Sequence, residues 1–134
     1  MTESIEKKIL TKYRNVAVVG ASPKPERYSN AVAGYLAEKG YNVIPVNPNY
    51  TEVLGRKSYP SLSAIPEKVE VVDIFRRPEE VMPVVEEAIK IGAKAVWMQE
   101  GVVNEAAAAK ASKAGLLVVM DRCMMKEHYR LIRN

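Results

Sequence analysis

The sequence predicts an open α/β fold, in which a parallel sheet is covered by helices. Five short runs are rich in valine and isoleucine and are apolar at nearly every position, which is typical of strands buried on both faces. Helical patterns separate most of these runs, so right-handed crossovers between parallel strands are expected. The five predicted strands cover residues 16–19, 43–46, 69–75, 95–98 and 116–120.

Helices are predicted between most of these strands. Residues 30–39 form one apolar face, and residues 78–90 form another, within which Pro83 should bend or restart the helix. Asn104 is the expected N-cap of an alanine-rich helix that ends before Gly115.

Two flanking helices and one weak crossover complete the prediction. Ile5, Ile9 and Tyr13 share a helical face before the first strand, and a last helix follows Asp121, its expected N-cap. The segment 47–66 is rich in proline and glycine, so it is predicted to be a loop, with one short helical turn near residues 61–64.

Composition indicates one globular domain. The 134 residues are 48% apolar and 27% charged, and a single cysteine excludes an internal disulfide, so a reducing cytoplasm is the expected location. The chain has no apolar run that suggests a membrane helix. The net charge of +4 would suit an anionic ligand as well as nucleic acid. A chain of this length has no room for a separate catalytic domain, which favours binding over catalysis.

The loop after the first strand is the most informative candidate site. The strand ends at Gly20 and a helix starts near Ser29, where free backbone N–H groups and the helix dipole favour an anion. Lys24 and Arg27 add positive charge, and Ser22 can donate to phosphate oxygens. An ordinary polar turn with a serine cap is the alternative.

Familiar nucleotide motifs are absent from this loop and its neighbour. A G-x-G-x-x-G fingerprint would need glycines where the chain has Ser22 and Pro25. The second strand ends in residues 45–48, which offer no carboxylate for the ribose hydroxyls of NAD. The chain also contains no G-x-x-x-x-G-K-[ST] phosphate loop.

Two further strand ends carry polar candidates. Arg76 and Arg77 after the third strand can clasp a phosphate, and Phe75 offers a face for a flat ring. Gln99, Glu100 and Gly101 follow the fourth strand at the expected switch in strand order. A surface arginine, a core phenylalanine and a solvated carboxylate are the plainer interpretations, and for Glu100 the plainer one is favoured.

Cys123 and His128 lie five residues apart, so a nucleophilic pair is one interpretation. A buried apolar cysteine and a surface or capped histidine are the favoured interpretation. No group of residues has metal-ligand spacing, and no metal site is expected. Nucleic-acid binding has little support beyond net charge.

Four motifs together carry a family resemblance: VGAS, PVNP, FRRPEE and WMQEG, in this order. Across residues 12–128 the chain resembles the stand-alone CoA-binding proteins. These are similar to the CoA-binding domain of the succinate–CoA ligase α chain and of the NDP-forming acyl-CoA synthetases. The resemblance implies a single Rossmann-like, doubly wound domain over residues 1–134, with five mainly parallel strands in the order 3-2-1-4-5 and helices on both faces.

The resemblance also implies that coenzyme A or an acyl-CoA lies across the strand ends. Its phosphates would meet Gly20, Ala21, Ser22, Arg27, Tyr28 and Ser29. Its adenine and 3′-phosphoribose would be framed by Val46, Asn47, Pro48, Phe75, Arg76 and Arg77. Its pantetheine arm would run toward Gln99 and Gly101. The 3′-phosphate explains why no carboxylate follows the second strand, because a carboxylate there would repel it.

Several functions stay open beside simple binding. The large synthetases carry a further domain with a phosphorylated histidine, which this chain lacks, so it would need a partner subunit to act as part of a synthetase. Thioester chemistry at Cys123 is a weaker variant of that hypothesis. An NADP-binding module is a third candidate, because Arg76 and Arg77 could hold its 2′-phosphate. No nucleic-acid or membrane partner is expected, and a homo-oligomer stays open.

Overall fold

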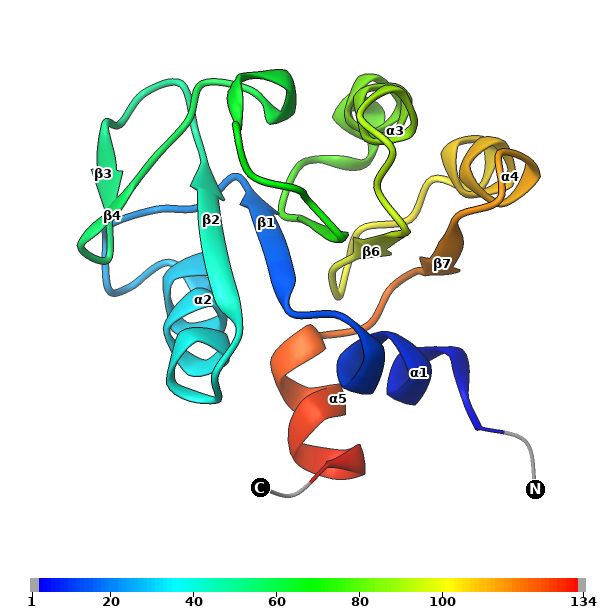
Figure 1. Ribbon diagram of the computed structural model, residues 1–134, viewed down its shortest axis with the longest axis horizontal. Coiled ribbons are helices and arrows are strands. Elements are labelled where there is room, and N and C mark those ends of the chain that lie inside the picture. The colour runs from blue at the N-terminus through cyan, green and yellow to red at the C-terminus, as the bar shows by residue number, and fades with distance from the viewer. Residues whose placement is uncertain (1–2, 133–134) are drawn as a thin grey trace.

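A sheet of five parallel strands forms the centre of the molecule (Figure 1). The computed structural model describes residues 3–132. The strands run side by side in the order β2-β1-β5-β6-β7, and nearly all of their residues are buried. Their bounds are β1 Asn15–Val19, β2 Asn42–Val46, β5 Val71–Ile74, β6 Ala95–Met98 and β7 Leu117–Val119. The predicted α/β fold with a parallel sheet is therefore confirmed.

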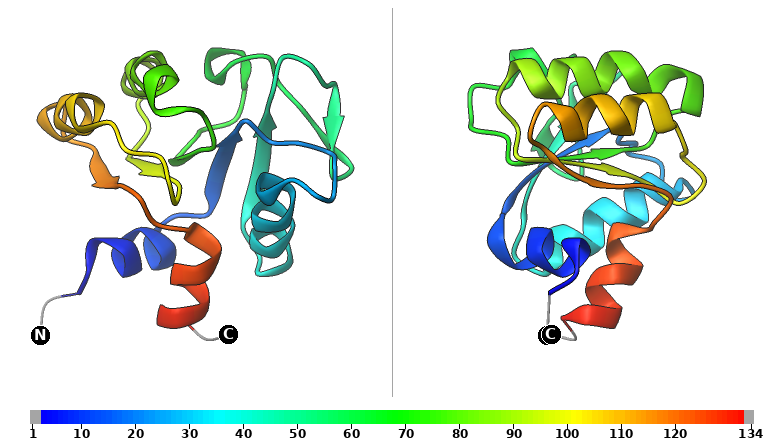
Figure 2. Two further views of the ribbon diagram at one scale, coloured as in Figure 1. Left: turned by 180° about the vertical axis from the view of Figure 1, so that it is seen from behind. Right: turned by 90° about the vertical axis from the view of Figure 1, so that its right-hand side faces the viewer.

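Helices cover both faces of this sheet, as the two views of Figure 2 show. One face is packed by α1 (Ile5–Lys12), α2 (Tyr28–Glu38) and α5 (Met124–Leu131). The other is packed by α3 (Val81–Lys90) and α4 (Glu105–Lys113). Two separate apolar clusters result, one on each side of the sheet. Within residues 3–132, no helix has the length and apolar character needed to cross a membrane.

The predicted strand order 3-2-1-4-5 is wrong. In chain order the sheet is 2-1-3-4-5, because β5 pairs with β1 and leaves β2 at the edge. Pro45 explains this position. Its carbonyl accepts a hydrogen bond from the Tyr59 N–H, 3.0 Å away, so the backbone of Pro45 points away from β1. Proline has no N–H to donate on that side, and a second full strand there would lose a ladder bond.

This correction moves the switch in strand order. From β1 the chain continues to β2 on one side of the sheet, and from β5 it continues to β6 on the other side. The switch therefore lies between β1 and β5, rather than at the loop that holds Gln99, Glu100 and Gly101. Ligands of open α/β sheets bind outside the carboxyl ends of the strands at such a switch. Gly20 and Phe75, which directly follow these two strands, therefore mark the centre of the expected binding edge.

The segment between β2 and β5 contains more structure than predicted. The expected turn is present as a 3₁₀ helix, η1 (Leu62–Ala64). A small antiparallel hairpin, β3 (Glu52–Val53) and β4 (Arg56–Lys57), was not predicted. Its two-residue turn, Leu54 and Gly55, has φ angles of 55° and 70°, the left-handed values of a hairpin turn. The sequence pattern did not predict this turn, because hairpin turns of this kind favour asparagine or aspartate at the position that Leu54 occupies.

The predicted helix ends are largely confirmed. The Asn104 side chain accepts a hydrogen bond from the Ala107 N–H and caps α4. A 3₁₀ turn, η2 (Pro78–Glu80), precedes α3, so Pro83 falls in the first turn, where its missing N–H is tolerated. The prediction for Asp121 is wrong, because Cys123 is the N-cap of α5. Asp121 instead accepts a hydrogen bond from the Gly101 N–H, 2.8 Å away.

Candidate functional site

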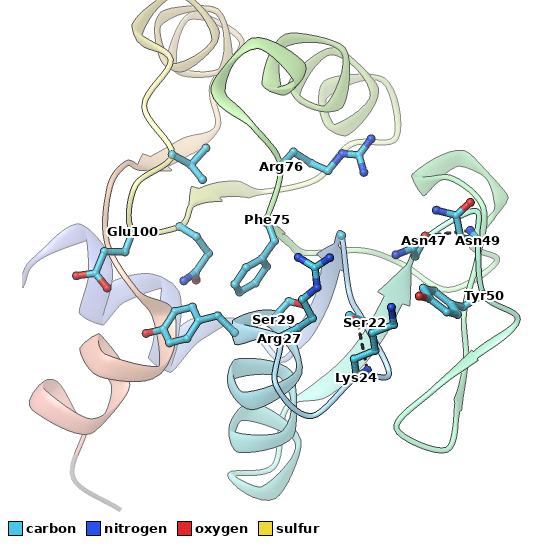
Figure 3. Close-up of a pocket in the computed structure, with 14 residues that line it drawn as sticks. Ser22, Lys24, Arg27, Ser29, Asn47, Asn49, Tyr50, Phe75, Arg76 and Glu100 are labelled. Carbon is cyan, nitrogen blue, oxygen red and sulfur yellow. Dashed lines mark hydrogen bonds between the residues drawn. The ribbon is translucent and has the colours of Figure 1, made fainter.

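A pocket of about 460 Å³ lies at the carboxyl ends of β1, β2, β5 and β6 (Figure 3). The pocket is formed by loops that follow four strands and by the start of α2, which agrees with the edge predicted from the sequence. Its lining residues are Gly20, Ser22, Lys24, Arg27, Tyr28, Ser29, Asn47, Asn49, Tyr50, Phe75, Arg76, Gln99, Glu100 and Val102.

Backbone hydrogen bonds hold the strand ends together beneath the pocket. The Gly20 N–H donates to the Val46 carbonyl at 2.9 Å, and the Phe75 N–H donates to the Val19 carbonyl at 2.8 Å. Gly20 has a φ of 91°, and a β-carbon there would overlap the carbonyl oxygen of Phe75. Only glycine combines this backbone conformation with so close an approach.

Side-chain amides hold the first loop in place from two sides. The Asn47 amide donates to the Ala21 carbonyl at 2.8 Å, and the Asn30 amide donates to the Ser22 carbonyl at 2.9 Å. Within the loop, the Ser22 hydroxyl accepts a hydrogen bond from the Lys24 N–H at 3.1 Å. The loop is therefore anchored to both β2 and α2, and its backbone is prearranged at the edge of the pocket.

The start of α2 has the features of an anion site. Arg27 is the N-cap residue, and its side chain makes no capping hydrogen bond, so the first N–H groups of the helix are not satisfied by a cap. The helix dipole adds partial positive charge at this end. Lys24 and Arg27 line the same pocket, and neither forms an ion pair with any residue between 3 and 132. An anionic ligand would find two unpaired cations here.

The two arginines after β5 have different surroundings. Arg76 lines the pocket, and its Nε lies 3.6 Å from the Glu80 carboxylate. Arg77 is 74% exposed and donates to the other oxygen of Glu80 at 3.0 Å. This hydrogen bond and the two nearby arginine charges lower the pKa of Glu80. Arg77 therefore lies outside the pocket, although the family resemblance implied a site role for it.

A buried amide closes the pocket beside β6. Gln99 is only 2% exposed, and its Oε1 accepts a hydrogen bond from the Met124 N–H at 3.1 Å. Its Nε2 has no partner among the described residues. A buried donor without a partner is rare in proteins, and here it belongs to a pocket-lining residue. It is a ready donor for a ligand carbonyl.

Charge is distributed unevenly around the pocket. Figure 3 shows Glu100 on the side opposite Asn47, Asn49 and Tyr50. The Glu100 carboxylate pairs with the Lys126 ammonium at 3.0 Å, on the solvent side of the loop. The favoured interpretation of Glu100 as a solvated carboxylate is thus only partly right, because the residue is exposed but also lines the pocket.

A carboxyl group with no hydrogen bond is buried below the pocket. Asp73 lies in β5 and is fully buried, and neither of its oxygens has a partner among residues 3–132. Burial raises the pKa of Asp73 well above its usual range, so the protonated, neutral form is favoured. Sequence reasoning missed this residue, because it stands inside an otherwise apolar strand.

Cys123 and His128 do not form a pair. The Tyr28 hydroxyl donates to Cys123 Sγ at 2.8 Å, whereas the Tyr35 hydroxyl lies 2.8 Å from His128 Nδ1. Cys123 is buried, as expected. His128 is buried too, so the surface position, one of the two alternatives expected for it, is wrong. Burial lowers the pKa of His128, and the nearby charges of Lys39 and Arg14 lower it further.

Most residues proposed from the sequence come together in this pocket. Val46 and Pro48 lie beside it, in a smaller cavity of about 150 Å³ that also touches Gly20 and Arg76. Three do not line either cavity. Ala21 is buried, and its carbonyl accepts the hydrogen bond from the Asn47 amide. Arg77 is exposed to solvent, and the N–H of Gly101 donates to Asp121. The residues that line the main pocket are Gly20, Ser22, Arg27, Tyr28, Ser29, Asn47, Phe75, Arg76 and Gln99.

Asn49, Tyr50 and Val102 line the pocket but were not predicted. Asn49 and Tyr50 follow β2 directly after Pro48, so the strand-end argument could have included them. Val102 follows Gly101 in the same way. In the part of the chain that the structure describes, no three His, Cys, Asp or Glu residues are grouped to hold a metal ion.

Comparison with known proteins identifies the family. Residues 14–129 match the family described as a CoA binding domain. The chain belongs to this family. The CoA-binding domain accounts for nearly the whole chain, and the pocket lies entirely within it.

Relatives of this CoA-binding domain include small proteins and large ligases. A hypothetical protein from Pyrococcus horikoshii has 56% identity and a TM-score of 0.94, with 98% of this chain and 93% of that chain covered. Bacillus subtilis YneT, an uncharacterized protein, is 39% identical over 91% of this chain and 90% of its own length. An ADP-forming acetate–CoA ligase of Archaeoglobus fulgidus is 40% identical over 54% of this chain, which covers 10% of that ligase.

Proposed function

We propose that this protein binds coenzyme A or an acyl-CoA in the pocket at the strand ends. The observation that carries the proposal is that Lys24, Arg27 and Arg76 line one pocket, which also contains the uncapped start of α2. Coenzyme A is a polyanion with a pyrophosphate and a separate 3′-phosphate, so it needs cations at two places. Membership of the CoA-binding domain family supports the same ligand.

The pyrophosphate is assigned to the first loop and the start of α2. Backbone N–H groups at an uncapped helix start suit phosphate oxygens, and Lys24 and Arg27 neutralise their charge. The close contact at Gly20 leaves no side chain between this loop and the end of β5. Ser22 and Ser29 are buried hydroxyls that line the same side of the pocket.

The 3′-phosphoribose and adenine are assigned to the ends of β2 and β5. Arg76 is the cation in reach of the 3′-phosphate, and Arg77 is left out of this assignment because it faces solvent. Asn47 and Phe75 line the pocket, and Val46 and Pro48 line the adjoining cavity, so together they offer an apolar and polar frame for adenine. The ring of Phe75 supplies a flat face.

The pantetheine arm is assigned to the β6 side. Its amide groups carry carbonyl oxygens, and the unpartnered Nε2 of Gln99 is a donor that such an oxygen would satisfy. Ligand binding would remove the cost of leaving this buried donor unpaired. The fit supports a ligand that brings a carbonyl oxygen to this end of the pocket, as the pantetheine arm of coenzyme A would.

The role proposed is binding without catalysis by this chain alone. The pocket residues named above hold and orient anionic and amide groups, and none of these roles requires a bond to be made. A synthetase partner subunit would add catalysis and is a second candidate, because part of a large acetate–CoA ligase is 40% identical to 54% of this chain. The cytoplasm is the proposed location, since a free thiol such as Cys123 suits a reducing compartment.

Isothermal titration calorimetry tests this proposal. Coenzyme A, dephospho-CoA, NAD and NADP are each titrated into the purified protein under one buffer and salt condition. We expect coenzyme A to bind most tightly and dephospho-CoA more weakly, because it lacks the 3′-phosphate. The absence of a binding signal with coenzyme A, or tighter binding of NAD or NADP, would overturn the proposal.

A further inference from the structure

One hydroxyl group separates the sulfur of Cys123 from the pocket. Tyr28 lines the pocket, and its hydroxyl donates to Cys123 Sγ at 2.8 Å. Cys123 itself is 2% exposed, whereas Tyr28 is 43% exposed. The Tyr28 ring also packs edge-to-face against Phe75, with the ring centroids 6.5 Å apart, so rotation would exchange this contact for access to the sulfur. Rotation of Tyr28 would bring the only thiol of the chain to the pocket.

A second feature indicates that a ligand reaches this end of the pocket. The Nε2 of Gln99 is a buried, unpartnered donor on a pocket-lining side chain. The opposite end of the same amide is held by the N–H of Met124, the residue next to Cys123. A ligand arm that satisfies Gln99 would therefore pass close to the N-terminus of α5, where Cys123 lies.

The charges around the sulfur do not oppose an anionic ligand. Asp73 lies in β5, near Tyr28, and burial favours its neutral form. The Glu100 carboxylate is paired with Lys126 at 3.0 Å. The phosphates of a bound ligand would lie at the other end, beside Lys24 and Arg27. The thiol is thus close to the arm of the ligand and away from its charged groups.

We propose that Cys123 forms a mixed disulfide with coenzyme A by thiol–disulfide exchange with a CoA disulfide held in the pocket. This proposal rests on the proposed function, because the same pocket must hold the nucleotide. The reactive end of coenzyme A is its terminal thiol, at the end of the pantetheine arm that Gln99 would bind. Oxidised coenzyme A presents a disulfide at that same position.

The exchange is balanced without a further oxidant. The Cys123 thiolate attacks one sulfur of the CoA disulfide, and a new bond forms between Sγ and that sulfur. The original sulfur–sulfur bond breaks, and its electron pair leaves with the second coenzyme A as a thiolate, which takes up a proton. One disulfide is consumed and one is made. Excess free thiol reverses the step.

Intact-protein mass spectrometry measures this reaction. The reduced protein is mixed with CoA disulfide, quenched with acid at set times, and examined for a mass increase of one coenzyme A. Pantethine, the disulfide of pantetheine, is the matched control, because it has the same reactive end but lacks the nucleotide. Desulfo-CoA serves as a competitor that occupies the pocket and cannot react. Cys123→Ser and Cys123→Ala identify the modified residue.

We expect CoA disulfide to react about a hundredfold faster than pantethine, since binding raises the effective concentration of the disulfide at Cys123. Desulfo-CoA should slow both reactions, because it occupies the pocket through which either disulfide reaches Cys123, and both cysteine variants should form no adduct. Equal rates for the two disulfides, or no adduct when calorimetry detects bound coenzyme A, would overturn the inference. If calorimetry detects no binding, the proposed function fails instead.

Discussion

The carbonyl oxygen of Phe75 fills the space in which a β-carbon on Gly20 would lie. These residues directly follow β1 and β5, the two strands between which the switch in strand order lies. The backbone of the first loop can therefore lie directly against the end of β5. The floor of the pocket depends on this approach, because any side chain at position 20 would separate the two strand ends.

Gly20→Ala should be strongly destabilising. A β-carbon would overlap Phe75, and the φ of 91° is strained for any residue with a side chain. We expect a loss of about 2–4 kcal/mol in the free energy of unfolding, measured by urea denaturation. Gly34→Ala is the matched control. Gly34 lies inside α2 with free space around it, so Gly34→Ala should raise the free energy of unfolding by ~0.5–1 kcal/mol. Equal effects at both sites would contradict the packing described.

Arg76→Ala and Arg77→Ala should differ in their effect on coenzyme A. Loss of a charge-assisted hydrogen bond to the 3′-phosphate should weaken binding roughly 10- to 100-fold in Arg76→Ala. The affinity for dephospho-CoA should change far less, since that ligand has no 3′-phosphate. Arg77→Ala removes the same charge from a side chain outside the pocket and should change either affinity less than threefold, roughly the effect of a distant surface charge. Calorimetry with both ligands distinguishes these outcomes. Equal losses for both ligands in Arg76→Ala would show that Arg76 does not bind the 3′-phosphate.

Asp73→Asn should make the protein more stable at alkaline pH. The pKa of Asp73 is raised in the folded state, so the folded state holds a proton that the unfolded chain releases. The wild type should therefore lose stability as the pH rises toward the folded-state pKa. Asparagine has nearly the same shape and does not titrate. At pH 8 we expect its free energy of unfolding to exceed that of the wild type by about 1 kcal/mol or more. The difference in the free energy of unfolding between Asp73→Asn and the wild type, measured by urea denaturation, should be smaller at pH 4 than at pH 8. An equal difference at both values would contradict the titration of Asp73.

His128 should produce the opposite dependence on pH. Burial lowers the pKa of His128 in the folded state, so the unfolded chain binds a proton more readily. The contribution to stability is complete above the unfolded-state pKa of about 6.5 and is lost as the pH falls toward the folded-state value. Relative to His128→Gln, which does not titrate, the wild type should lose up to ~1.4 kcal/mol between pH 7.5 and 5.5. Parallel pH profiles for the two proteins would show that His128 has no part in this loss.

Strands and helices were predictable because their signals are local. The apolar runs and the Asn104 cap each depend on neighbouring residues, and the structure confirms them. Strand order depends on pairing between segments that are distant in sequence, and only Pro45 indicated the position of β2 in the sheet. Pro45 lacks an N–H and therefore predicts an edge strand, which is the position that β2 has.

The candidate site was predictable as a set of loops but less so as a set of side chains. All loops that line the pocket follow predicted strands. Arg76 and Arg77 are identical in type, adjacent in sequence and both close to Glu80, yet only Arg76 lines the pocket, whereas Arg77 is 74% exposed. Asp73 was unpredictable, because burial of a carboxyl without partners depends on packing between segments that are distant in sequence.

The hydrogen bonds between Pro45, Asn47 and Tyr59 have a consequence for aggregation. An exposed strand edge can recruit a strand from another molecule through its free N–H and carbonyl groups. On β2, proline removes one donor, and Tyr59 uses the Pro45 carbonyl and the Asn47 N–H. β7, at the opposite edge, has only three residues. Both margins of the sheet are therefore poor templates for intermolecular pairing, which favours a protein that stays dispersed at high concentration.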